Sequence, residues 1–190
     1  MTTLYLAGDA DADALLARDP FALLVGMLLD QQVPMEKAFA GPAVIVSRLG
    51  TETLDPAVVV DRDPDEFAEL VSRTPAVHRF PGAMAGRIQK LASYVVEEYD
   101  GDAAAIWTGA HTGAELLRRL KALPGFGAQK AAILVALLGK QFDVRPDGWR
   151  EAAGAYGEEG ASRSVADVVD DESLARVRAT KREAKRAAKA

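Results

Sequence analysis

The segment LPGFGAQKA, residues 123–131, has the composition of a tight turn that leads into a helix. Gly125 and Gly127, preceded by Pro124, let the backbone turn sharply before an apolar run. The first amides of the following helix then lack an intrahelical acceptor, and the helix dipole favours an anion beside them. The segment therefore predicts an anion-binding hairpin; the alternative is a plain connection between two helices.

Two helices are expected to position this hairpin. Thr112 with Glu115 three residues later forms a capping box, so a helix is predicted to start there and to run through LLRRLKAL. The run AAILVALLG after the hairpin is apolar on every face, which is typical of a helix that is buried all round.

Most of the remaining chain also predicts helices, and the sequence indicates an all-α fold. Val58–Val60 is the best candidate for a strand, and residues 152–166, rich in Gly, Ala and Ser, predict a flexible connection. The other predicted helices are 20–30, opened by Asp19-Pro20; 34–49, with a kink or break at Gly41-Pro42; 63–72; and 85–99, with a final helix at the C-terminal end.

Composition excludes several kinds of site. The 190 residues contain no Cys, and His78 and His111 are the two imidazoles, so a Cys-ligated zinc or iron–sulfur site is excluded. Any reaction must rest on carboxylates, amines, hydroxyls or amides. The longest apolar runs are too short for a membrane span, which needs about 20 residues, and the start of the chain is not a signal peptide. A cytoplasmic protein with no membrane partner is expected.

Charge is distributed unevenly along the chain. The formal net charge is −5, which by itself disfavours a nucleic-acid partner. From Arg176 onward, however, seven basic residues accompany one acidic residue, so this end carries +6 and the remainder −11. Such a basic end indicates either contact with phosphates or a solvated helix terminus.

Three segments in order resemble the helix–hairpin–helix DNA glycosylase superfamily, which includes endonuclease III, adenine glycosylase and alkylpurine glycosylases. The segments are DPFALLVGMLLDQQ, GAMAGRIQKLASYVVEEYDGD and ELLRRLKALPGFGAQKAAILVALLG. The resemblance covers about residues 19–150 and implies a two-lobed helical fold. Residues 19–150 would form the domain that contains hairpin 123–131, and residues 1–18 with 151–190 a small second lobe with a basic C-terminal helix or tail.

The resemblance implies a double-stranded DNA partner from which one nucleotide is extruded, because its N-glycosidic bond is inaccessible inside the stack. Main-chain amides of the hairpin would hold a phosphate, and a glutamine would fill the gap left by the base; the alternative is that the glutamines cap helix 20–30. Lys130 would contact a phosphate or face solvent. The residues expected at DNA are thus Gly125, Phe126, Gly127, Ala128, Lys130, Gln31 and Gln32.

The resemblance also implies a catalytic aspartate about twenty residues after the second hairpin glycine, and Asp147 stands there. A carboxylate close to the sugar stabilises positive charge as the base departs and helps to activate water. Three alternatives stay open: Asp147 caps the next helix, Gly148 occupies the catalytic position, or Asp143 substitutes for Asp147. Trp149, two residues on, is a candidate for stacking on the extruded base.

Lyase members of the family carry a nucleophilic lysine two residues after the second hairpin glycine, where this chain has Gln129. Lys130 is adjacent but rotated by about 100° on a helix. Strand cleavage is therefore not expected, and neither an iron–sulfur cluster nor another cofactor or metal is implied.

The resulting hypothesis is a monomeric, monofunctional DNA N-glycosylase that releases a damaged or mispaired base in base excision repair. A first alternative is a catalytically inactive DNA-binding protein that retains the fold. A second alternative is a helical protein–protein interaction domain in which the hairpin is only a turn.

Overall fold

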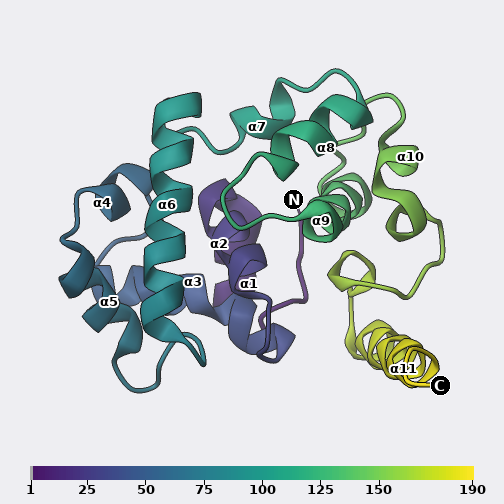
Figure 1. Ribbon diagram of the computed structural model, residues 1–190, viewed down its shortest axis with the longest axis horizontal. Coiled ribbons are helices and arrows are strands. Elements are labelled where there is room, and N and C mark those ends of the chain that lie inside the picture. Colours follow the sequence, from purple (N-terminus) through teal and green to yellow (C-terminus); the bar gives the residue numbers. More distant parts are fainter. Residues whose placement is uncertain (1) are drawn as a thin grey trace.

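The computed structural model describes residues 2–190, which form helices joined by short loops (Figure 1). Within this range no strand forms, and the β contact present is an isolated bridge between Thr112 and Asp147. The all-α prediction is confirmed. In chain order the elements are α1 (Ala10–Arg18), α2 (Pro20–Leu29), α3 (Met35–Leu49), α4 (Pro56–Val60), α5 (Pro64–Ser72), α6 (Pro81–Tyr99), α7 (Ala105–Thr108), α8 (Gly113–Lys121), α9 (Ala128–Gln141), α10 (Trp149–Ala153), the 3-10 turns η1 (Gly154–Gly157) and η2 (Val165–Asp167), and α11 (Asp171–Ala187).

Side-chain caps set the starts of several helices. Asp19 accepts a hydrogen bond from Ala22 N–H and Pro20 occupies the first turn of α2, as the sequence predicts. The predicted cap at Thr112 is also confirmed, since its Oγ1 accepts a hydrogen bond from Glu115 N–H at 3.1 Å. In a full capping box the Glu115 carboxylate would accept a hydrogen bond from Thr112 N–H. It accepts one from His111 N–H instead, at 3.0 Å, one residue earlier in the chain.

Val58–Val60, the best candidate for a strand in the sequence, form the end of α4 instead. The apolar, β-branched run favours a strand locally. Asp55, however, caps Ala57 N–H, and Pro56 supplies the fixed φ of a first helical turn. This local start outweighs the β propensity of the three valines.

Two other helix boundaries differ from those predicted. Helix α3 continues through Pro42, with no break into two helices, while Gly41 packs so closely on α2 that a Cβ there would lie 2.6 Å from Leu29 Cδ1. Helix α6 begins at Pro81, four residues earlier than the apolar pattern indicates, because Pro81 is suited to a first turn.

The segment 152–166 is folded back onto α9, contrary to the prediction of a flexible connection. Ser164 and Asp167 form a capping box around η2. Asp167 also pairs with Lys140 at 2.5 Å, with both side chains largely buried, and Gln141 Nε2 donates to the carbonyl of Ala166 at 2.9 Å. These contacts join residues far apart in sequence, which a local composition does not reveal.

The buried apolar side chains form one continuous cluster from Leu4 to Val177. Helix α2 lies at its centre, and each of its residues from Phe21 to Leu29 is buried. The N-terminal segment contacts the start of α11, where Tyr5 Oη donates a hydrogen bond of 2.6 Å to Asp171. Within the described range, no helix is both long and apolar enough to span a membrane.

Candidate functional site

The hairpin between α8 and α9 places two exposed glycines on either side of a buried phenylalanine. Gly125 has φ +84°, a left-handed conformation that favours glycine, and a Cβ there would lie 2.5 Å from Leu28 Cδ1 of α2. Phe126 is buried beneath the turn. Gly127 borders open space, since a Cβ at this position would meet no atom within 4 Å. The hairpin is therefore anchored on α2 and open to solvent at Gly127.

The N-terminus of α9 carries no side-chain cap. Gly127 is the N-cap residue, in extended conformation, and has no side chain that could accept a hydrogen bond from the first turn. Phe126 N–H is already used, because it donates to Leu123 O at 3.0 Å. Of the predicted main-chain contacts, those at Gly127 and Ala128 thus remain the best placed for an anion.

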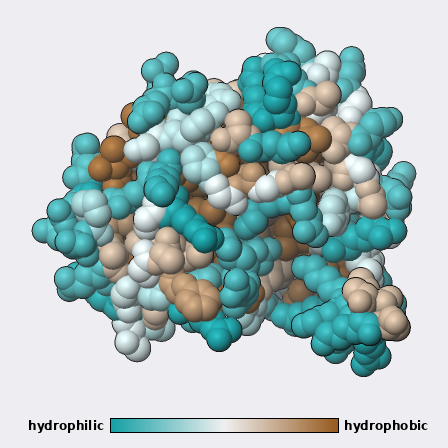
Figure 2. All heavy atoms as spheres, in the orientation of Figure 1, coloured by the Kyte–Doolittle hydropathy of each residue, from teal (hydrophilic) through white to brown (hydrophobic). Residues whose placement is uncertain are grey.

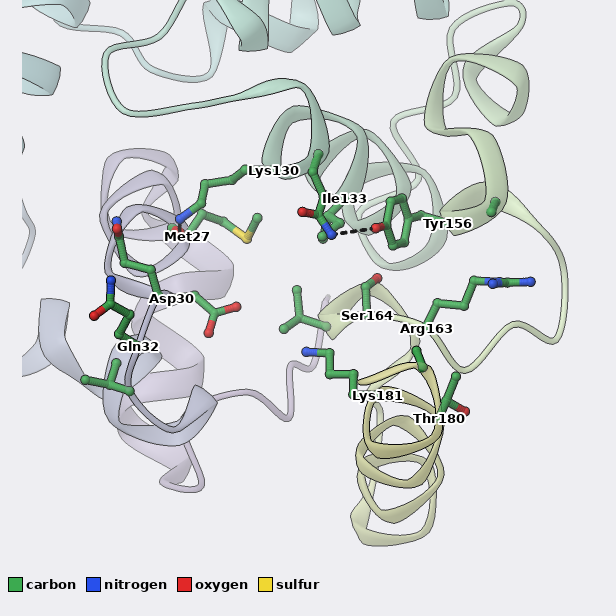
Figure 3. Close-up of a pocket in the computed structure, with 16 residues that line it drawn as sticks. Met27, Asp30, Gln32, Lys130, Ile133, Tyr156, Arg163, Ser164, Thr180 and Lys181 are labelled. Carbon is green, nitrogen blue, oxygen red and sulfur yellow. Dashed lines mark hydrogen bonds between the residues drawn. The ribbon is translucent and has the colours of Figure 1, made fainter. Parts of the chain in front are cut away.

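A cleft of about 570 Å³ opens beside this helix end (Figure 3). We call it the central cleft. It is lined by the α2–α3 connection, the first turns of α9, η1, the start of η2, and one face of α11. Its size lies in the range of small-molecule sites, roughly 300–1,000 Å³. The polar side chains of its lining include those of Asp30, Gln32, Gln129, Lys130, Tyr156 and Lys181.

Gln31 and Gln32 have different surroundings at the rim of this cleft. Gln31 Nε2 donates to Leu28 O at 2.8 Å, so this side chain caps the end of α2, as one alternative in the sequence proposed. Gln32 is exposed and has φ +57°, a left-handed conformation that is unfavourable for a residue with a Cβ. Figure 3 shows the amide of Gln32 at the edge of the cleft, on the side away from Tyr156.

A buried histidine holds the loop that carries Gln31 and Gln32. His78, which is almost fully buried, forms a hydrogen bond of 2.8 Å between Nε2 and the carbonyl of Gln31. Its Nδ1 accepts a hydrogen bond from Phe80 N–H at 3.0 Å, so Nε2 carries the proton in the neutral ring. The sequence did not indicate this role for His78.

Lys130 faces the end of α2. Its Nζ donates hydrogen bonds to Met27 O and, at 3.2 Å, to Leu28 O. Burial lowers the pKa of Lys130, and the neighbouring Asp30 carboxylate partly opposes that effect. An ammonium that satisfies carbonyls at a helix C-terminus stabilises that end. Lys130 is thus neither fully solvated nor free.

Gln129, at the position of the lyase nucleophile in the resembling family, links α9 to η1. Its Nε2 donates a hydrogen bond of 2.9 Å to Tyr156 Oη (Figure 3). Tyr156 thereby forms part of the wall of the central cleft. The sequence did not single out Tyr156, because the contact depends on the folding back of residues 152–166.

Asp147 and Trp149 lie away from the central cleft. Asp147 is exposed, and its carbonyl accepts a hydrogen bond of 2.7 Å from Gly113 N–H at the start of α8. Gly148, not Asp147, is the N-cap residue of α10. Trp149 is buried against Gly139, where a Cβ would lie 2.3 Å from Trp149 Cε3. The structure therefore does not bring either residue together with the hairpin.

Asp30 is the carboxylate that lines the central cleft, and the motifs of the sequence do not point to it as a site residue. Burial raises the pKa of Asp30, and Lys181 and Lys130 oppose that shift. Figure 3 shows Asp30 and Lys181 pointing toward one another from opposite walls. One sequence signal was available, since Asp30 opens the polar step Asp30-Gln31-Gln32 after a wholly apolar helix.

Helix α11 supplies a basic wall. Its exposed side is largely hydrophilic in the space-filling view, at the lower right (Figure 2). Val177 anchors the helix in the core, and Arg178 pairs with Glu36 of α3. Lys181 lines the cleft and Lys185 lies one turn further along. Part of the +6 charge of this end therefore borders the cleft.

Comparisons with known proteins add no family assignment. The chain matches no protein-family model, and it matches no curated protein and no solved structure.

Proposed function

We propose that this protein binds double-stranded DNA at hairpin 123–131 and hydrolyses the N-glycosidic bond of a damaged or mispaired base held in the central cleft. The observation that carries the proposal is the position of the uncapped N-terminus of α9 directly beside this cleft. An uncapped helix end suits a phosphate, and a cavity of about 570 Å³ suits an extruded nucleotide. The resemblance of residues 19–150 to the helix–hairpin–helix glycosylases supports the same reading.

Different residues of the site would contact different parts of the DNA. Gly127 and Ala128 amides would position a backbone phosphate without reading sequence. Gln32, exposed at the cleft rim, is the better of the two glutamines to enter the gap left by the base, because Gln31 is held by α2. Lys181 and Lys185 would add attraction for phosphates, which compensates locally for the net charge of −5.

A second candidate, a DNA-binding protein without catalysis, is favoured by one observation. Asp147, the aspartate that the resemblance implies, is exposed and bound through its carbonyl to Gly113 rather than set in the cleft. Both candidates share the DNA interface and differ only in the chemistry.

Binding to a duplex that contains a stable abasic-site analogue tests the shared part. Fluorescence anisotropy is expected to show tighter binding to this duplex than to the unmodified duplex, since no base needs to be extruded. Equal affinity for the two contradicts the extrusion of a nucleotide into the cleft. No affinity for either contradicts the proposal as a whole and favours a protein-interaction domain. Release of a free base from duplexes that carry a damaged or mispaired base then separates the two candidates.

A further inference from the structure

Asp30 has an unusual environment for a partly buried carboxylate. Its carboxylate forms no hydrogen bond or ion pair with the described residues 2–190, whereas its N–H is fixed by Gly26 O at 3.1 Å and Met27 O at 3.3 Å. The backbone is thus held, and the side chain extends into the central cleft (Figure 3).

Other buried carboxylates of this chain are satisfied by main-chain donors. Asp13 Oδ1 accepts from Leu6 and Ala7 N–H at 2.8 and 2.9 Å. Asp19 accepts from Ala22 N–H through Oδ1 and from Leu54 N–H through Oδ2. Such bonds offset the cost of desolvating a charge. Asp30 has no such bond within residues 2–190, and its carboxylate faces the open cleft instead.

The position of Asp30 adds a second cost. It follows the last turn of α2, where the helix dipole disfavours negative charge. Of the two lysines that act on Asp30, Lys130 is committed to the carbonyls of Met27 and Leu28. A carboxylate that the fold holds at a cost, and points into a cavity, is typical of a functional group.

Asp147, by comparison, is remote from this cavity. The segment that carries it is fixed near Gly139, since Arg145 Nε donates to Gly139 O at 2.8 Å. The cleft is bounded by Gln129 on the same helix. Ten residues of α-helix separate the two places by about 15 Å along the axis.

From this geometry we infer that Asp30 is the catalytic carboxylate of the central cleft, the group that acts on the sugar of an extruded 2′-deoxynucleotide. The inference rests on the proposed function and assigns its chemistry to a residue from a different helix. Lys181, opposite Asp30, would lie beside the 5′ or 3′ phosphate of the same nucleotide.

The reaction balances with water as co-reactant. The C1′–N bond breaks and its electron pair leaves with the base, while the ionised Asp30 carboxylate stabilises the positive charge on the sugar. Water then forms the new C1′–O bond. One water proton passes to Asp30 and from there, through solvent, to the released base, so base–sugar plus water becomes free base plus an abasic sugar.

Single-turnover base release by Asp30→Asn, Asp147→Asn and the control Glu98→Gln tests this assignment. Asp30→Asn is expected to slow release at least 100-fold, with affinity for the abasic-analogue duplex within threefold of wild type. Asp147→Asn and Glu98→Gln should stay within threefold in both measurements. Glu98 is an exposed acid on α6 and does not line the cleft.

Three outcomes are decisive. Slow release by Asp30→Asn alone supports the inference. Loss of release by Asp147→Asn, with Asp30→Asn active, overturns it and leaves the proposed function standing. A wild-type protein that releases no base from any duplex overturns both. Thermal melting of each variant confirms that the fold is retained, and Asp30→Glu serves as a second variant, expected to keep part of the rate because it keeps the carboxylate.

Discussion

Arg87 of α6 donates a hydrogen bond of 3.1 Å from Nη1 to the side-chain carbonyl of Gln31. Because Gln31 Nε2 is bound to Leu28 O at the same time, the amide is held at both ends. The neighbouring Gln32 side chain has no such partner in residues 2–190, and its backbone adopts an unfavourable left-handed conformation. Two adjacent glutamines thus have separate roles, one in the fold and one at the cleft.

Substitutions at the two glutamines should therefore have opposite effects on stability. Gln32→Gly should raise the free energy of unfolding by up to about 1 kcal/mol, because glycine accepts φ +57° without strain. It should also slow base release, since no side chain would fill the gap in the stack. Gln31→Ala should lower stability by roughly 0.5–1 kcal/mol through its lost hydrogen bonds.

Urea titration and single-turnover assays of both variants provide the measurement. A Gln32→Gly protein with unchanged release would contradict the assignment of Gln32 to the interface. If Gln31→Ala keeps the stability of wild type but releases the base slowly, Gln31 and not Gln32 acts at the DNA interface.

Gly127→Asp should separate stability from DNA binding. The extended backbone of this N-cap suits aspartate, whose carboxylate would accept hydrogen bonds from the free amides of α9. The helix should gain a few tenths of a kcal/mol. DNA affinity should fall by at least about tenfold, since the carboxylate takes the place of a phosphate and repels it.

Gly127→Ala is the matched control, because it adds a Cβ in open space with neither a cap nor a charge. Its affinity should remain within about threefold of wild type. If Gly127→Asp binds DNA as wild type does, the hairpin is only a connection between helices.

Lys181→Gln and Lys185→Gln should each weaken DNA binding and its salt dependence. A phosphate contact that is lost reduces the slope of log K against log salt by about 0.9 on duplex DNA. The double variant should therefore lose nearly two units of slope. Arg176→Gln is the control on the same helix, since Arg176 is already paired with Glu172. If the slope of log K against log salt is unchanged in the double variant, α11 does not contact DNA.

Asp30→Asn should make the protein more stable at neutral pH. The charged groups that act on Asp30 are Lys181 of α11, Lys130 of α9 and Glu36 of α3, while Arg163, which also lines the cleft, pairs with Glu158. Burial raises the pKa of Asp30 above its unfolded value despite the lysines. The ionised side chain therefore lowers stability above that raised pKa, and the effect disappears once pH falls below the unfolded value.

The melting temperature of Asp30→Asn at pH 7 should exceed that of wild type, and for a chain of this size each 1 kcal/mol of added stability raises it by about 2–4 °C. Near pH 3 the two proteins should have the same melting temperature, because Asp30 of the wild type is then protonated in both the folded and the unfolded state. A lower melting temperature for Asp30→Asn at pH 7 would mean that the carboxylate serves the fold.

Local signals accounted for most helices and for the hairpin. Asp19-Pro20 and Thr112 mark helix starts because a cap and its helix lie within a few residues. The cleft depends on contacts between distant residues, such as Gln129 with Tyr156 and Lys140 with Asp167. Nothing near Tyr156 in the sequence indicates this partner, so neither the folded 152–166 segment nor the role of Asp30 followed from spacing.

Hydrolytic release of a base from duplex DNA is the step that distinguishes a glycosylase from a protein that only binds DNA. Single-turnover incubation with duplexes that each carry one alkylated, oxidised, deaminated or mismatched base tests it most directly. Mass spectrometry of the small-molecule fraction would identify any free base, and alkali treatment would reveal the abasic site. We expect free base and an alkali-labile site from at least one duplex, with the strand intact before alkali. Binding to these duplexes without release of base from any of them would contradict it.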